Sequence, residues 1–335
     1  MREFLRKKGV NLSLRTYFVT SLSFMALGLF SSLIIGLIVR TAGQQLGIAF
    51  LTDMGQLAMS LMGPAIGVAV AYGLGAPRFV LFASVVTGAA GAQLGGPAGS
   101  FAAALLGVEF GKLISQETKL DIIITPFVTI AVGYLVAVFI GPGINRAMLG
   151  LGDMIMWATV QQPFVMGILV ATLMGLALTA PISSAAIAIM LGLEGVAAGA
   201  ATVGCAAQMV GFAVASFREN GISGLVSQGL GTSMLQIGNI VKNPRILLPP
   251  TIAGMILAPF ATVMFKMVNI PEGAGMGTSG LVGQIMTFSV MGFSWGTLAI
   301  VAMLHFVGPA VISLIVSEAM RKAGWIRFGD MKIEQ

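Results

Sequence analysis

Long apolar runs with few or no charged residues recur along this chain. The first extends from Tyr17 to Val39, and others lie at 122–140, 246–267 and 297–317. Each is about as long as the roughly 20 residues that an α-helix needs to cross a bilayer. Only 9% of the 335 residues are charged and the mean hydropathy is +0.97, which leaves too little polar surface for a water-soluble protein. The chain is therefore predicted to be an all-α polytopic membrane protein.

Charged residues are concentrated at the two ends of the chain. Since no charged stretch is long enough for a separate soluble domain, residues 1–335 are predicted to form a single transmembrane domain. The net charge of +6 offers no folded soluble face for nucleic acid, so we expect membrane lipid and no nucleic acid as partner. Basic residues that flank spans mark the cytoplasmic side. Both the basic N-terminus, 1–16, and the C-terminal tail, 320–335, are therefore expected in the cytoplasm.

Glycine and proline divide the apolar sequence. Breaks are predicted at Gly63-Pro64 and Gly95-Gly96-Pro97, and a span is predicted to end at Gly141-Pro142-Gly143. Residues 144–160 mix charged and apolar side chains, which predicts an amphipathic helix at the membrane interface. One long apolar stretch is expected from Ala185 to Phe217. Inspection finds no clean internal repeat. Glycines at four-residue spacing predict close helix packing, as in Gly91, Gly95 and Gly99, and in Gly195 and Gly199.

The segment from Arg218 to Arg245 interrupts the apolar pattern with amides, hydroxyls and glycines. It cannot be a lipid-facing helix, because its polar groups would lack partners in hydrocarbon. Two interpretations remain: a loop outside the membrane, or a hairpin that folds back into a protected cavity. Glycines permit the irregular backbone of a hairpin, and few charges are present for a solvated loop. We expect Gly221–Arg245 to fold back and form a ligand site around Gln228.

Two motifs in this segment resemble a known family. Gly224-Leu225-Val226-Ser227-Gln228-Gly229, followed by Asn243-Pro244-Arg245 and then Pro249-Pro250, resembles the substrate-binding hairpin of the membrane (IIC) component of the sugar phosphotransferase system. The wider run from Gly229 to Arg245 is similar to IIC-like membrane proteins that include the perfringolysin O regulator. The resemblance implies a IIC-like fold of about ten transmembrane helices with re-entrant hairpins. It also implies a homodimer in the bacterial cell membrane and separate phosphotransferase IIA and IIB subunits.

One position departs from the family pattern. The sugar-binding glutamate of the family motif aligns with Gln228, and a neutral amide can hydrogen-bond a sugar but cannot act as a base. The chain shows no appended domain for a phosphocysteine or phosphohistidine, and Cys205 and His305 lie in apolar context. We therefore expect no enzymatic activity, no catalytic set, no cofactor and no metal site in this chain.

The candidate substrate-binding residues are polar groups in or near apolar sequence. Intramembrane carboxylates are costly and each is a functional candidate, although Asp53 and Glu109 also fit helix ends and Glu194 fits a structural role. A lone histidine such as His305 is more often structural than a proton relay. The predicted substrate-binding set is Gln228, Ser227, Thr232, Ser233, Asn239, Asn243, Glu194 and Glu109.

Three functions compete on these observations. The first is a transporter that binds or moves a small polar, sugar-like molecule by alternating access. The second is a membrane sensor or regulator that keeps the fold and acts indirectly on gene expression, including toxin expression, since no DNA-binding domain is visible. The third, an intramembrane enzyme, lacks a catalytic set. The substrate itself cannot be deduced from the sequence.

Overall fold

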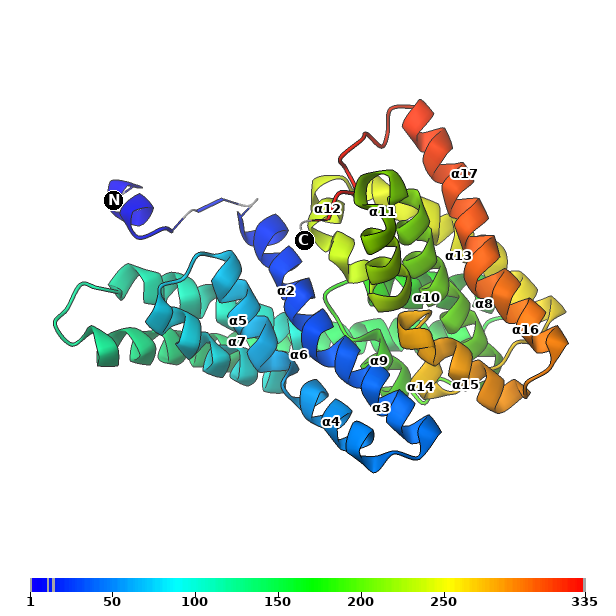
Figure 1. Cartoon of the computed structure of the whole chain (residues 1–335), viewed down its shortest axis with the longest axis horizontal. Coiled ribbons are helices and arrows are strands. Elements are labelled where there is room, and N and C mark those ends of the chain that lie inside the picture. Colours follow the sequence, from blue (N-terminus) through cyan, green and yellow to red (C-terminus); the bar gives the residue numbers. More distant parts are fainter. Residues whose placement is uncertain (1, 11, 14–15, 334–335) are drawn as a thin grey trace. The chain divides into compact units, whose positions relative to one another are not determined.

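The computed structural model describes residues 2–10, 12–13 and 16–333, and it divides into two compact units. Unit 1 is Met1–Leu149 and unit 2 is Gly150–Gln335 (Figure 1). The elements that begin in unit 1 are α1 Arg2–Lys7, the π-helix η1 Thr16–Thr20, α2 Ser21–Leu29, the π-helix η2 Phe30–Ile34, α3 Ile35–Leu46, α4 Ala49–Ser60, α5 Met62–Gly73, α6 Arg78–Ile114 and α7 Asp121–Thr159.

Unit 2 contains long helices joined by several short helical turns. Its longer elements are α8 Pro163–Thr179, α10 Gly195–Ala215, α11 Phe217–Val226, α13 Leu248–Pro259, α15 Val282–Met291 and α17 Gly308–Lys322. Its shorter ones are α9 Ser184–Met190, η3 Ser227–Gly231, η4 Ser233–Gln236, α12 Ile237–Lys242, η5 Pro244–Leu247, η6 Phe260–Met264, α14 Pro271–Ala274, η7 Ser279–Leu281, α16 Trp295–Val301 and η8 Ala302–Val307. Of these short elements, η3, η6 and η8 are π-helical, and η4, η5 and η7 are 3₁₀ turns. The described residues form no strand beyond an isolated bridge between Gly195 and Asn269.

The prediction of an all-helical membrane protein is confirmed. Within the described residues, six helices are long and apolar enough to cross a membrane, or seven when α4 and α5, which meet at 51°, are counted as one broken span. Shorter apolar helices lie at Pro163–Thr179 and Ser279–Met291. Large apolar side chains such as Phe139 and Trp295 are exposed on these helices, as expected for a surface that faces lipid.

The predicted break at Gly95-Gly96-Pro97 is confirmed as a sharp bend inside α6. Gly96 has φ 60° and ψ −152°, a conformation that is open essentially only to glycine. Beyond the bend the two parts of α6 approach so closely that a methyl group on Gly91 would lie 2.3 Å from the carbonyl oxygen of Gly99. The glycine spacing therefore serves contact within α6 itself.

Two predicted boundaries are wrong. The span expected to end at Gly141-Pro142-Gly143 continues, because α7 runs unbroken to Thr159 and includes the segment expected as a separate helix at 144–160. Proline and glycine are tolerated inside membrane helices when neighbouring groups satisfy the freed backbone. The stretch from Ala185 to Phe217 is divided into α9 and α10, because Gly192 and Gly195 adopt positive φ angles of 57° and 64°.

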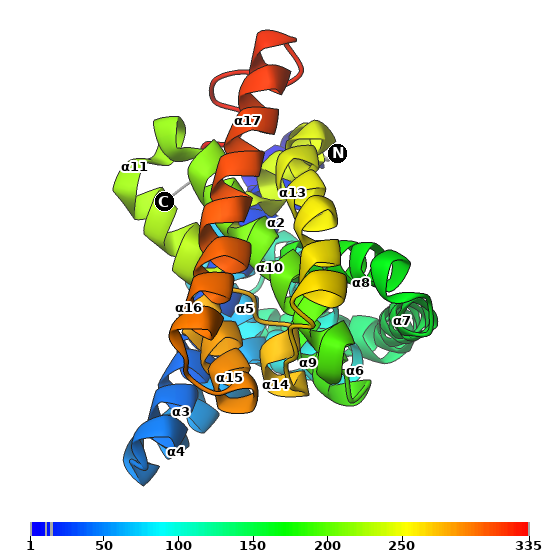
Figure 2. The same ribbon diagram turned by 90° about the vertical axis from the view of Figure 1, so that its right-hand side faces the viewer.

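Helix α10 is the centre of unit 2. It contacts α8, α13 and α17, and 89% of its most apolar window is buried (Figures 1 and 2). Small residues allow this, since a methyl group on Gly204 would lie 2.0 Å from the carbonyl oxygen of Ala171 in α8. In lipid, such close backbone approach replaces the hydrophobic effect as the force that joins helices.

We predict that Gly204→Leu destabilises unit 2 strongly. The added side chain would meet the backbone of α8, which cannot move aside, so the cost should reach about 3 kcal/mol or more. The control is Gly150→Leu, because a methyl group at Gly150 meets nothing within 4 Å. Thermal unfolding in mild detergent should show a large loss for the first variant and little change for the second. Equal stabilities would contradict the close α8–α10 packing.

Candidate functional site

The polar segment Arg218–Arg245 folds into short helices packed on α10, and its amides form a buried relay. Gln228 Nε2 donates to Ser216 Oγ at 2.9 Å and to the carbonyl of Gly224 at 3.0 Å. Gln236 Nε2 donates to Gln228 Oε1 at 2.8 Å, and Asn239 Nδ2 donates to Gln236 Oε1 at 2.8 Å. We call Ser216, Gln228, Gln236 and Asn239 the amide relay. Its four side chains are buried, so each amide depends on the next for a partner.

The hydroxyls that flank Gln228 have separate roles. Thr232 Oγ1 accepts from the backbone N–H of Met234 and so caps η4, and Ser227 makes only a 3.4 Å contact to the Gly224 carbonyl. Ser233 Oγ lies 2.8 Å from Thr179 Oγ1 of α8. A second buried polar cluster continues from there, since Thr179 Oγ1 donates to Gln208 Oε1 at 3.4 Å and Gln208 Nε2 donates to Thr251 Oγ1 at 2.8 Å.

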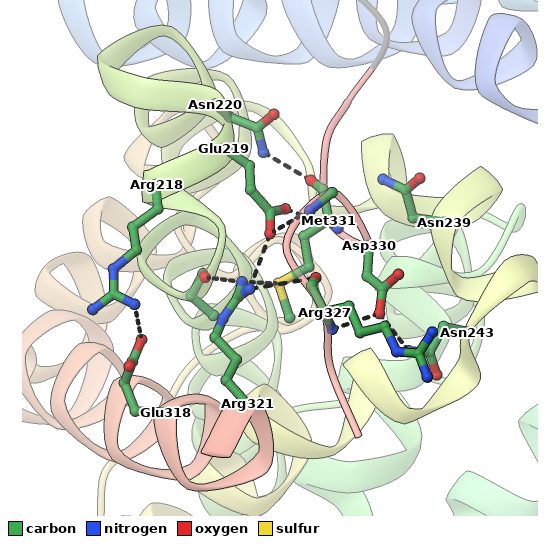
Figure 3. A network of polar contacts seen from close by, with 12 residues as sticks. Arg218, Glu219, Asn220, Asn239, Asn243, Glu318, Arg321, Arg327, Asp330 and Met331 are labelled. Atoms are coloured by element: carbon green, nitrogen blue, oxygen red, sulfur yellow. Dashed lines mark hydrogen bonds and ion pairs between the residues drawn. The ribbon is translucent and has the colours of Figure 1, made fainter. Parts of the chain in front are cut away.

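The C-terminal tail contacts the amide relay, of which Figure 3 labels Asn239 together with the tail residues Arg327, Asp330 and Met331. Gln236 Nε2 donates to the carbonyl of Met331 at 2.9 Å, and Asn239 Nδ2 donates to the carbonyl of Lys332 at 2.9 Å. Asn220 binds the same stretch from the other direction, donating to the Met331 carbonyl and accepting from the Ile333 N–H. Met331 and Ile333 are buried, so the tail is a packed part of unit 2. The amides therefore hold the backbone of the C-terminal tail.

A buried ion pair anchors the tail. Glu219 accepts from Arg321 Nη1 at 3.0 Å and from the backbone N–H groups of Gly329 and Met331 (Figure 3). The Glu219 side chain is fully buried and that of Arg321 is 11% exposed. Arg321 also donates to the Ala215 carbonyl at the end of α10. One carboxylate thus joins α11, α17 and the tail.

Asn243 connects the second motif to the tail. Its Nδ2 donates to the Trp325 carbonyl at 3.0 Å and to Asp330 Oδ2 at 2.9 Å, and its Oδ1 accepts from the Arg245 N–H. The Arg245 guanidinium lies 5.7 Å from the centre of the Trp325 ring, in cation–π range. Asn243-Pro244-Arg245 therefore caps η5 and holds the tail at the same time.

The two carboxylates of the predicted set are not members of the relay. Glu194 is exposed and directly precedes α10, at the point where the expected apolar stretch is divided. Glu109 belongs to unit 1, where it pairs at 3.1 Å with Lys112, a fully buried lysine that also donates to the Leu74 carbonyl. Asp53, the third carboxylate, is exposed in α4.

Several residues of this site were not predicted from the sequence. Gln236 stood in the polar segment but was not selected, and no local pattern indicates that Glu219 or Asn220 binds residues more than 100 positions away. His305 is buried with its Nδ1 2.9 Å from Gln284 Nε2. Among the described residues, no group of three or more His, Cys, Asp or Glu side chains could hold a metal ion.

The family now follows from sequence comparison. The family described as "Phosphotransferase system, EIIC" matches residues 19–333, nearly the whole chain and both compact units. The chain belongs to this family of membrane-embedded components of sugar transport, which work with separate IIA and IIB components. It is therefore a multi-pass protein of the plasma membrane, as expected. Neither a curated protein nor a solved structure matches it.

We predict that Glu219→Gln releases the tail and destabilises unit 2. Breaking a buried ion pair leaves an uncompensated charge on Arg321, which costs about 3–5 kcal/mol. The control is Glu318→Gln, whose partner Arg218 is 64% exposed, because an exposed pair contributes about 0–1 kcal/mol. The two variants should differ clearly in thermal unfolding. Equal losses would show that the Glu219 pair has no special role.

Proposed function

We propose that this chain binds a neutral, sugar-like molecule at the amide relay and moves it across the membrane by alternating access. The family supplies the transport role. The single observation that supports the site is a buried cluster of neutral donors and acceptors inside an otherwise apolar protein. Amides orient hydroxyl groups without the desolvation cost of a buried charge. Gln236 and Asn239 donate to the carbonyls of Met331 and Lys332. In this proposal the structure is a closed state, and the tail carbonyls occupy the positions of the sugar hydroxyls.

The proposal includes the assembly that the family resemblance implies. The single transmembrane domain carries about ten membrane segments, of which α8, the η7–α15 segment and the bent α6 supply those beyond the long spans. Two copies form a homodimer, and both termini lie in the cytoplasm. Separate IIA and IIB subunits supply any phosphoryl transfer, and Gln228, a neutral amide, binds the sugar without acting as a base.

We predict that Gln228→Ala weakens sugar binding about three- to tenfold, as expected for one lost hydrogen bond. The probe is a panel of hexoses, hexitols and N-acetylhexosamines, and the readout is the sugar-dependent rise in unfolding temperature of the purified protein. Gln45→Ala is the control, because Gln45 is exposed in α3. If a sugar binds both variants as tightly as the natural protein, the relay is not the sugar site.

The second candidate function is a membrane sensor or regulator, and the tail contacts favour it specifically. A ligand that takes the donors of Gln236 and Asn239 must displace the carbonyls of Met331 and Lys332. Binding would then free a basic cytoplasmic tail for a partner protein, and gene expression would change indirectly.

This candidate predicts ligand-dependent exposure of the tail. In inside-out vesicles, a binding sugar should accelerate trypsin cleavage after Arg327, and Asn239→Ala should accelerate it without sugar, because one tail contact is lost. The exposed residue Lys119 provides an internal cleavage standard. Unchanged cleavage in the presence of a bound sugar would contradict the sensor mechanism and leave the transporter.

A further inference from the structure

An eight-residue sequence occurs twice in unit 2. Residues 221–228 read Gly-Ile-Ser-Gly-Leu-Val-Ser-Gln and residues 277–284 read Gly-Thr-Ser-Gly-Leu-Val-Gly-Gln, which agree at six of the eight positions. Both copies begin with a glycine of positive φ, 59° at Gly221 and 53° at Gly277. Inspection of the sequence alone overlooked this repeat. We call the two stretches the first and second copies.

The two copies are in contact. Thr278 Oγ1 in the second copy donates to the carbonyl of Gly229, directly after the first copy, at 2.5 Å. The copies differ at two positions, Ile222 against Thr278 and Ser227 against Gly283. The second difference has a steric reason, since a methyl group on Gly283 would lie 2.2 Å from the Gly277 carbonyl oxygen. Asn269 fixes the second copy from outside by donating to the Gly283 carbonyl at 3.0 Å.

The glutamines that end the copies differ in how their hydrogen bonds are satisfied. Gln228 is fully buried and uses both its amide nitrogen and its oxygen within the protein. Gln284 is 4% exposed and binds His305 at 2.9 Å, yet Gln284 Oε1 and His305 Nε2 have no partner. Ser279 Oγ, also in the second copy, is buried without a partner as well. Unpaired buried polar atoms are rare and costly. Among the described residues others lie on Arg40, Glu109 and Arg321, whereas the second copy has two and its partner His305 a third.

The Gln284–His305 pair has the hydrogen-bonding capacity of a site for a hydroxyl group. If Gln284 Nε2 donates to Nδ1, then Oε1 remains as an acceptor and Nε2–H of the imidazole remains as a donor. If the amide is turned, its NH₂ group remains as the donor and imidazole Nε2 as the acceptor. Either assignment leaves one free donor and one free acceptor, which separate hydroxyl groups of a polyhydroxy ligand can use.

The local backbone also has the features of a binding site. Leu281, between Ser279 and Gln284, has a φ of 60°, which is costly for a residue with a branched side chain. His305 lies in the π-helical turn η8, within the membrane span Trp295–Lys322. π-helical turns occur often at functional sites. Placing an ionisable side chain inside a membrane span costs free energy, and such residues are often functional.

We propose that Gln284 and His305, together with Ser279 of the second copy, form a second polar subsite that binds hydroxyl groups of the transported sugar. The relay at Gln228 and this subsite are then equivalent ends of the two copies, one closed by its own protein partners and one left open for ligand. This inference rests on the proposed function, because it takes the ligand to be a polyhydroxy molecule.

His305 is the only histidine of the chain, so a ¹⁵N-histidine-labelled protein gives the Nδ1 and Nε2 resonances of one imidazole. Titration with the same panel of hexoses, hexitols and N-acetylhexosamines should shift the Nε2 resonance for each sugar that raises the unfolding temperature. Gln284→Met should weaken that sugar about three- to tenfold and abolish the shift. His305→Gln, which keeps a donor and an acceptor, should retain more affinity than His305→Leu. Size-exclusion profiles confirm that each variant is folded.

The outcomes separate the two proposals. If a sugar binds and needs Gln228, but His305 does not respond and Gln284→Met binds normally, the second subsite is wrong and the relay stands. If the sugar needs Gln284 and His305 but not Gln228, the subsite stands and the proposed relay site fails. If no sugar of the panel shifts either the unfolding temperature or the His305 signal, both are overturned.

Discussion

The polar groups buried in this protein must find their partners inside it, because the lipid around it offers none. The amide relay meets this constraint with neutral side chains: Gln228, Gln236 and Asn239 each donate to a neighbouring acceptor, and no net charge is buried. A carboxylate at Gln228 would face the carbonyl of Gly224, which now accepts from the amide. The departure from the glutamate of the family motif therefore agrees with the contacts around it.

The same constraint explains why α10 is rich in small residues. Lipid tails are as apolar as the helices, so helices associate through close packing, and Gly204 allows α8 to approach at backbone distance. This packing brings Thr179 of α8 beside Ser233 and Gln208. The apolar packing thus determines where the polar groups meet.

In unit 2 the C-terminal tail satisfies the polar groups near one copy of the repeated octapeptide but not those of the other copy. Glu219 and Asn220 hold the backbone of Met331 beside the relay, so the first copy of the repeat is satisfied and closed. The second copy keeps unpaired atoms on Gln284 and Ser279. A transporter needs a site that binds ligand in one state and closes in another. In this structure the first copy is satisfied and the second is not, and Thr278 joins the two within one compact unit.

The apolar runs determined the helical membrane class, because a span depends on local composition and length, and the break at Gly95-Gly96 was visible because only glycine adopts that backbone. The motif around Gln228 was enough to indicate the family. The tertiary structure alone showed which partners these side chains have. Gln236 donates to Gln228, which lies in the π-helical turn η3, and Glu219 accepts from the backbone of a tail more than 100 residues away. The sequence has no local signal for either contact. The tertiary structure also showed that α7 continues through Pro142. A membrane helix tolerates a proline only where neighbouring groups satisfy the freed backbone, and the sequence does not show those neighbours.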